Sequence, residues 1–236
     1  MSPYREYGVS LAEIALILVI LSLTAGAVLK GQELIFSARA KAIIGQTEQA
    51  RLGFLGFQDR FRGLPGDYRD APSNIPRVLY NGNGDGRIES GVTPVGANGV
   101  ADEDSIVWDH LSKAGFLSGS YDYSPGNPLA AIPRNIFGGC VGLLADNDYG
   151  DPSAPPPVSR HLIKTGSRIP VEYLAEMDTK IDDGNALKGG FQFSTDGYCS
   201  PAPLGPTSPA GCTDSGGNWR VGATPRPVNC GGASLL

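Results

Sequence analysis

Residues 9–29 read VSLAEIALILVILSLTAGAVL, and Gly8 precedes them. Glu13 is the only charged side chain in these 21 residues. At about 1.5 Å per residue, a helix of this length just crosses a hydrocarbon core of roughly 30 Å. We therefore expect residues 9–29 to form the transmembrane half of an N-terminal helix.

Two simple interpretations of this segment leave Glu13 unexplained. A secretory signal peptide would use Arg5 as its basic region, Ile14–Leu23 as its apolar region and Ala25-Gly26-Ala27 as its cleavage site. However, Glu13 lies where the apolar region begins, and the first eight residues have no net charge. A plain membrane anchor explains the length, but an acid in a spanning helix costs about 2.5–3.5 kcal/mol on insertion scales.

The pattern of Gly8, Val9 and Glu13 before an unbroken apolar run resembles the class III signal of type IV prepilins and type II secretion pseudopilins. In that family a short polar leader ends in Gly, and Glu is the fifth residue of the mature chain. Glu13 is the fifth residue counted from Val9. The resemblance implies that residues 1–8 are a leader, that prepilin peptidase cuts after Gly8, and that the new amino group of Val9 is methylated.

The same resemblance implies a structural role in a filament. The chain would be a subunit of a type IV pilus-like or type II secretion pseudopilus filament, assembled by inner-membrane machinery from copies of itself or related subunits. Glu13 would then meet the Val9 amine of a neighbouring subunit. Before assembly the chain would cross the bacterial inner membrane once, with its head in the periplasm. The alternative is a membrane-anchored periplasmic or extracellular binding domain that does not polymerise.

The helical pattern continues beyond residue 29. Apolar or small side chains recur at intervals of three or four residues, and no Pro lies between Pro3 and Pro65. We expect residues 30–62 to form an amphipathic half of the same helix, with Gly63 and Pro65 ending it. The stripe consists of Ile43, Thr47, Ala50, Phe54, Phe57 and Phe61.

Residues 63–236 contain most of the Gly and Pro and are expected to form a globular head. Short helices are predicted at residues 105–114 and 171–178, and a strand at residues 190–194. The fold class predicted is therefore α+β: a pilin-like long helix packed on a small antiparallel sheet with long Gly/Pro-rich loops. The sequence pI of about 5.0 argues against a nucleic-acid partner.

The four cysteines all lie in the head, at Cys140, Cys199, Cys212 and Cys230. An oxidising compartment favours disulfides, and four cysteines allow three connectivities. We favour Cys140 with Cys199 and Cys212 with Cys230, because the second pair closes a loop in a region with few apolar residues. A zinc site is the alternative, but the chain has no CxxC motif and only two histidines, His110 and His161.

Asn81, Asn83 and Asp85 alternate in a Gly-rich segment that resembles the first half of an EF-hand loop, which makes calcium a possible cofactor. The twelfth position is Val92 instead of Glu. One of Asp102, Glu103 and Asp104 would replace the missing ligand if the loop folds back. The alternative is a Gly/Asn turn with no metal. A second acidic cluster comprises Asp178, Asp182 and Asp183.

Catalytic motifs are scarce. Residues 213–217 resemble the nucleophile segment of trypsin-like proteases, but His161 lies only 54 residues before Ser215, too close for two β-barrels. The sequence contains no GxSxG, HExxH, GxGxxG or Walker A motif. We therefore expect a protein that is not an enzyme.

Overall fold

The computed structural model describes residues 10–89, 102–151, 155–195, 209–214, 216–225 and 227–236. Contacts divide the chain after Arg39 into two units. Helix α1, Leu11–Phe61, belongs to both units, and its bounds confirm the long N-terminal helix expected from the sequence.

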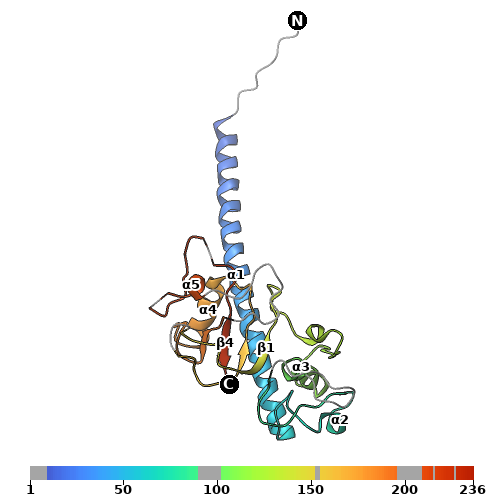
Figure 1. Ribbon diagram of the computed structural model, residues 1–236. Helices are drawn as coiled ribbons and strands as arrows, with labels where there is room; N and C mark the ends of the chain where they lie inside the picture. The colour runs from blue at the N-terminus through green and yellow to red at the C-terminus, as the bar shows by residue number, and fades with distance from the viewer. Residues whose placement is uncertain (1–9, 90–101, 152–154, 196–208, 215, 226) are drawn as a thin grey trace. The chain divides into compact units, whose positions relative to one another are not determined.

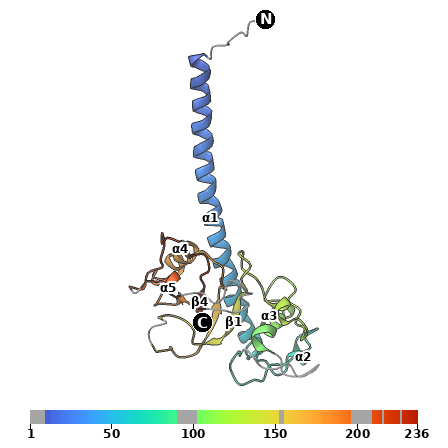
Figure 2. The same ribbon diagram turned by 45° about the horizontal axis from the view of Figure 1, so that its top comes forward.

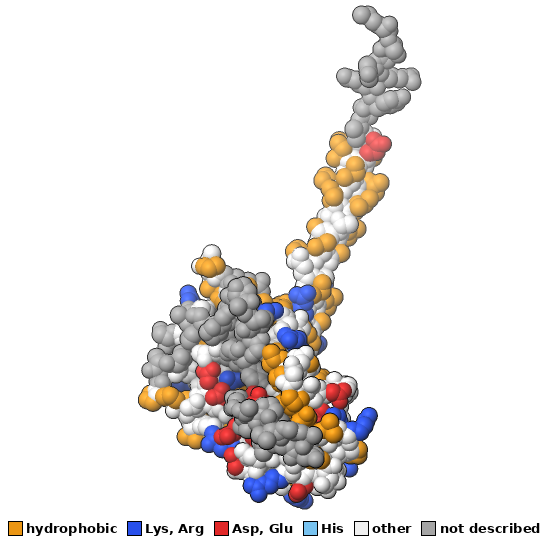
Figure 3. Space-filling model, turned by 45° about the vertical axis from the view of Figure 1, so that its right-hand side comes forward, with side chains coloured by type: hydrophobic (Ala, Val, Ile, Leu, Met, Phe, Trp, Pro, Cys, Tyr) orange, Lys and Arg blue, Asp and Glu red, His pale blue; other side chains and the backbone are white. Residues whose placement is uncertain are grey.

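In the first unit, the apolar side chains of α1 are exposed on every side. Leu16 is 62% exposed and Leu23 is 69% exposed, and none of the most apolar 18-residue window is buried. Apolar side chains cover this part of α1 in Figure 3. Among the described residues, α1 is the one helix whose length and composition would let it cross a membrane.

In the second unit, the C-terminal part of α1 carries the predicted apolar stripe into the head. Ile43, Ala50, Phe54 and Phe57 are at most 5% exposed, which confirms the helical spacing of the stripe. Phe57 is fully buried and belongs to one core with side chains of the sheet. Burying a side chain of this size is worth roughly 1.5–3 kcal/mol.

The helix ends in a way that the sequence analysis did not anticipate. Gly63 was expected to provide the stop, but Arg62 takes the left-handed conformation, with a φ of 53°. The amide of Arg62 still donates to the carbonyl oxygen of Gln58 at 3.0 Å. A left-handed residue commonly ends a helix, although the position usually favours Gly. This turn directs the chain into the segment around Gly66 and Asp67.

The head contains an antiparallel sheet of four strands in the order β1-β2-β4-β3. Leu144 on β1 faces Leu162 on β2, and Ser234 on β4 faces both Ile163 on β2 and Phe191 on β3. This sheet confirms the coarse α+β prediction. The strands are β1 Gly142–Asp146, β2 Arg160–Lys164, β3 Phe191–Phe193 and β4 Gly232–Leu235.

Short helices lie on both sides of the sheet region. In Figures 1 and 2, α2 and α3 lie to one side of strands β1 and β4, and α4 and α5 lie to the other. The predicted helices at residues 105–114 and 171–178 are confirmed, as is the strand near Phe191. The elements are α2 Ala71–Asn74, α3 Glu103–Lys113, η1 Pro128–Ala131, α4 Val171–Ile181 and α5 Pro209–Cys212.

A buried histidine on α3 fixes the segment that follows α1. His110 accepts a hydrogen bond from the Gly66 amide at Nδ1, at 3.0 Å, and its Nε2 lies 3.0 Å from the carbonyl oxygen of Tyr80. Burial lowers the pKa of His110 to about 4, so the ring is neutral at pH 7 and donates from Nε2. Its ring also stacks on Phe57, with centroids 6.3 Å apart.

The structure confirms one of the two expected disulfides, Cys212–Cys230. No described cysteine is free. Because a disulfide uses both sulfurs, zinc binding by Cys212 and Cys230 is excluded. Cys199 lies outside the described residues, so its pairing with Cys140 remains a prediction.

Replacing both Cys212 and Cys230 by Ala should lower the free energy of unfolding by about 3 kcal/mol, the chain-entropy value for a loop of roughly 15–20 residues. Urea unfolding of the full chain in detergent, followed by Trp fluorescence, would measure this loss. Reducing the wild-type protein should lower its stability by at least this amount, because reduction would also break a Cys140–Cys199 bond. An unchanged urea midpoint in the double variant would show that the bond does not stabilise the head.

Candidate metal centre

Three carboxylates converge in the head. Asp67, Asp85 and Glu103 each contribute one oxygen, and these oxygens all lie within 4.8 Å of one another. Asp67 follows the end of α1, Asp85 lies in the Asn/Gly-rich loop, and Glu103 is the first residue of α3. The fold therefore brings together three acids that follow one another in the sequence at intervals of 18 residues.

Asp67 organises the loop that contains Asp85. Its carboxylate accepts hydrogen bonds from the amides of Gly84, Asp85 and Gly86, at 3.0 Å for Asp85 and 2.8 Å for Gly86. Gly84 and Gly86 have φ angles of 73° and 88°, which favour glycine. The loop thus wraps its backbone around one buried carboxylate.

Glu103 closes the loop from the other side. Its Oε1 accepts from the Asn83 amide at 2.8 Å, and its Oε2 accepts from the Glu89 amide at 3.1 Å. The side chain is fully buried. Its position in the first turn of α3 is favourable for a negative charge, because the amide dipoles of a helix point their positive ends there.

The electrostatics of the cluster favour neutralisation. Burial raises the pKa of Glu103 to about 7, opposed by its two backbone hydrogen bonds and reinforced by the neighbouring charges of Asp67 and Asp85. Burial also raises the pKa of Asp67. A proton or a cation would relieve the repulsion. A divalent cation with a preference for oxygen ligands, such as Ca²⁺, fits the chemistry of three carboxylates.

Only part of this cluster was expected. Asp85 and Glu103 were among the candidate ligands, and the structure brings them together. Asn83 instead uses its Oδ1 to accept from the Asp85 amide at 2.8 Å, as in an ordinary Asn turn. The Oδ1 atom of Asn81 is buried without a hydrogen-bond partner among the described residues. Val92 lies outside the described residues.

Asp67 was missed by the sequence analysis. It lies in the Leu64–Asp67 turn, 18 residues before Asp85, and no local spacing connects the two. The contact depends on the path of the chain after α1 and on the anchoring of Gly66 by His110. The proximity of Asp67 and Asp85 therefore depends on the tertiary fold and not on local sequence.

The second acidic cluster has a structural explanation. Asp178 accepts from the Trp219 indole at 2.7 Å and from the Gly184 amide at 3.2 Å. Asp182 accepts from the Phe191 amide at 2.8 Å, and Asp183 accepts from the Asn185 amide at 2.8 Å. These bonds connect the end of α4 to β3 and to the C-terminal loops. One oxygen from each of the three acids also lies within 4.8 Å of the others, so the structure brings this predicted cluster together.

Glu13 has a local partner in the first unit, where Gly8 and Val9 lie outside the described residues. Its Oε2 accepts from the Ser10 amide at 2.8 Å, while the Ser10 hydroxyl accepts from the Ala12 amide at 3.3 Å. This pair is close to a capping box, in which a Ser and a Glu three residues later satisfy free amides at a helix start. This capping role of Glu13 was not among the sequence-based predictions.

The protease-like segment gains no support. Ser215 lies outside the described residues, and His161 uses Nε2 to accept from the Ile88 amide at 3.3 Å. Comparisons with protein-family models, curated proteins and solved structures found no match.

The raised pKa of Glu103 makes stability depend on pH when no divalent cation is present. The protonated form is favoured in the folded head, so this contribution is fully present below the ordinary pKa of 4.5 and is lost as pH rises through about 7. The rings of His110 and His161 act in the opposite sense, because their lowered pKa values add stability as the pH rises. Comparison with Glu103→Gln cancels the histidine contributions: in EDTA, going from pH 5 to pH 8 should change the melting temperature of wild-type protein less favourably than that of the variant, which thermal melts at both pH values would measure.

Calcium should reverse this loss if the cluster binds it. With an affinity on the order of 10⁻⁴ M, millimolar calcium at pH 8 should raise the melting temperature by about 5 °C. Asp85→Asn should reduce the rise, and Asp70→Asn, an exposed acid outside the cluster, should leave it unchanged. A melt that does not respond to calcium would leave the cluster as a protonated, hydrogen-bonded loop anchor.

Proposed function

We propose that the chain is a prepilin-type protein whose mature form is a structural subunit of a type IV pilus-like or type II secretion pseudopilus filament. Prepilin peptidase would cut it after Gly8, and the filament would assemble through α1. The proposal is supported by a single acid, Glu13, in the first turn of a helix whose apolar side chains are exposed throughout residues 14–29. That acid lies at the fifth position after a Gly.

The different surroundings of the two parts of α1 support the proposal. An exposed apolar helix needs lipid or other protein around it. In the membrane, lipid would cover residues 11–29, and in a filament the helices of neighbouring subunits would replace the lipid. The other part, from Ala40 onward, packs within the head through its apolar stripe. The antiparallel sheet is consistent with a pilin-like head.

The local cap at Glu13 leaves room for a role in assembly. A hydrogen bond from the Ser10 amide satisfies one oxygen of Glu13, but it does not cancel the negative charge. A charge in an apolar surrounding requires a cationic partner. Under our proposal the methylated amine of Val9 in a neighbouring subunit is that partner. Peptidase and inner-membrane assembly machinery are the other partners that the proposal requires.

The cap also favours a second candidate, a membrane-anchored binding domain that does not polymerise. A capping box stabilises a helix by about 0.5–2 kcal/mol, and this benefit explains an acid at residue 13 without a filament. The two candidates differ in what they require of Glu13: assembly requires its charge, and capping requires only its oxygen atoms.

The protein purified from its native host should begin at Val9 and carry an N-methyl group. Edman sequencing and intact mass would both detect this. The variant Gly8→Val should retain the leader, because the residue before the cut would be replaced. A mature chain that begins after Ala27 would establish the signal-peptide interpretation and contradict the proposal.

Three variants separate the charge of Glu13 from its capping role. Glu13→Gln keeps an oxygen for the Ser10 amide but removes the charge, and Glu13→Ala removes both. Ser10→Ala weakens the cap and keeps the charge. We expect both Glu13 variants to insert normally, since an intramembrane acid is costly, and to lose most filament incorporation. We expect Ser10→Ala to assemble.

Co-purification with sheared filaments, with membrane fractions as the control for insertion, measures these outcomes. Normal incorporation of Glu13→Gln together with failure of Glu13→Ala would assign Glu13 to capping alone. Normal incorporation of both would favour the simple anchor.

A further inference from the structure

A cavity of about 700 Å³ lies in the head at the C-terminal end of α1. Its size falls in the range of small-molecule sites. The last turns of α1, the segment that follows them, the loop around Gly84 and strand β2 all contribute to its wall.

Part of the wall is apolar. Phe54 is 5% exposed, and its ring lies tilted against the His161 ring, with centroids 5.9 Å apart. Tyr68 and Leu64 are half-buried members of the same core. A ligand that fills this part of the cavity would gain from the burial of an apolar body.

The polar part of the wall carries donors. Arg69 uses Nε to donate to the carbonyl oxygen of Asn83 at 2.6 Å, and its terminal nitrogens have no acceptor among the described residues. The only ion pair of Arg62 in the described chain is a loose one with Asp59, at 3.6 Å, on the protein surface. Both arginines line the cavity.

The third donor is His161. Because its Nε2 accepts from the Ile88 amide, the proton of the neutral ring resides on Nδ1. Among the residues that the structure describes, nothing accepts a hydrogen bond from this Nδ1. Burial is the main reason that the pKa of His161 is lowered, so the ring stays neutral at pH 7.

The acidic side chain on the wall is already engaged. Among the described residues, Asp67 is the one acidic side chain that lines the cavity, and its carboxylate accepts three backbone hydrogen bonds from the Gly84–Gly86 segment. The carboxamide of Gln58 and the terminal carboxylate of Leu236 are further acceptors on lining residues. Two arginines and a neutral imidazole still give this wall more hydrogen-bond donors than acceptors. A wall with excess donors favours a ligand that brings acceptors and negative charge.

The side chain of Arg69 is restrained by its neighbours, whereas Arg62 is held only at its backbone. Arg62 has the left-handed conformation that ends α1, which is unusual for a residue with a side chain, and its side chain is 82% exposed. The stem of Arg69 packs so closely on Gly84 that a Cβ atom there would collide with it. A fixed guanidinium loses less freedom when it binds an anion.

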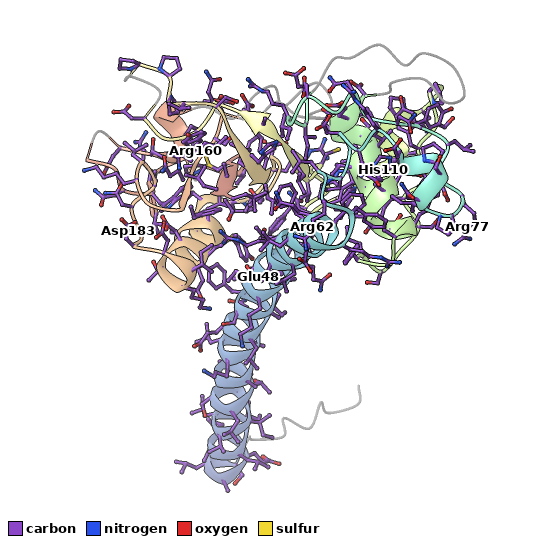
Figure 4. The ribbon with its side chains drawn as sticks, turned by 90° about the horizontal axis from the view of Figure 1, so that it is seen from below. Glu48, Arg62, Arg77, His110, Arg160 and Asp183 are labelled. Carbon is purple, nitrogen blue, oxygen red and sulfur yellow. A yellow bond between two sulfur atoms is a disulfide. The ribbon has the colours of Figure 1, made fainter. Side chains whose placement is uncertain are left out.

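We propose that this cavity binds a small organic carboxylate whose aromatic or branched aliphatic body packs against Phe54, Leu64 and Tyr68. Arg69 and Arg62 hold the carboxylate through charge-assisted hydrogen bonds. The Nδ1 of His161 donates a further hydrogen bond. Arg62 lies near the centre of the head in Figure 4, at the end of α1, whereas Arg77 lies at its edge.

Phenylacetate and its neutral analogue phenylacetamide provide a matched pair of probes. Titration calorimetry on the full chain in non-ionic detergent should show saturable binding of phenylacetate and about tenfold weaker binding of phenylacetamide, as expected for a charge-assisted hydrogen bond. Detergent alone favours the neutral amide, so micelles cannot produce this preference. Arg69→Gln and Arg62→Gln should each weaken phenylacetate binding, and Arg77→Gln should not.

Three results would overturn the proposal. These are the absence of saturation by phenylacetate in the millimolar range, equal binding of the acid and the amide, and unchanged binding in both Arg69→Gln and Arg62→Gln. Because Arg62 is exposed, its variant tests the cavity even if Arg69→Gln disturbs the loop. Far-ultraviolet circular dichroism of each variant checks that the fold is retained.

Discussion

The burial of one face of α1 is the constraint on which the head depends. Phe57 lies in the core, and the His110 ring stacks on it. His110 in turn holds the amide of Gly66, and the next residue, Asp67, gathers the backbone of the loop that contains Asp85. Each contact positions the next, so the acidic cluster and the cavity beside it both derive their geometry from a helix face.

Features that repeat along the chain could be predicted from the sequence. The spacing of Ile43, Phe54 and Phe57 indicated the buried face of α1, and local patterns indicated α3, α4 and β3. Contacts between distant segments could not be predicted in this way. The place of Asp67 beside Asp85 and the left-handed turn at Arg62 both depend on how α1 meets the head, and no periodicity in the sequence encodes that packing.

Glu13 occupies a position that fits both a local helix cap and a contact with a neighbouring subunit. Its position three residues after Ser10 is the spacing of a helix cap, and its position five residues after a Gly is the spacing of a prepilin signal. The hydrogen bond from the Ser10 amide to Glu13 meets the capping requirement within the chain. The charge remains, and in an apolar surrounding it is the larger energetic problem.

The strand order has a consequence for biosynthesis. Strand β4 lies between β2 and β3, although it is the last of the four strands to leave the ribosome. Until residues 232–235 are available, β3 has no neighbour in the sheet, and one edge of β2 presents unpaired amides and carbonyls. Open edges of this kind pair readily with other chains. The head therefore completes its sheet only after nearly the whole chain has been made, and the unfinished head needs protection from its neighbours during that interval.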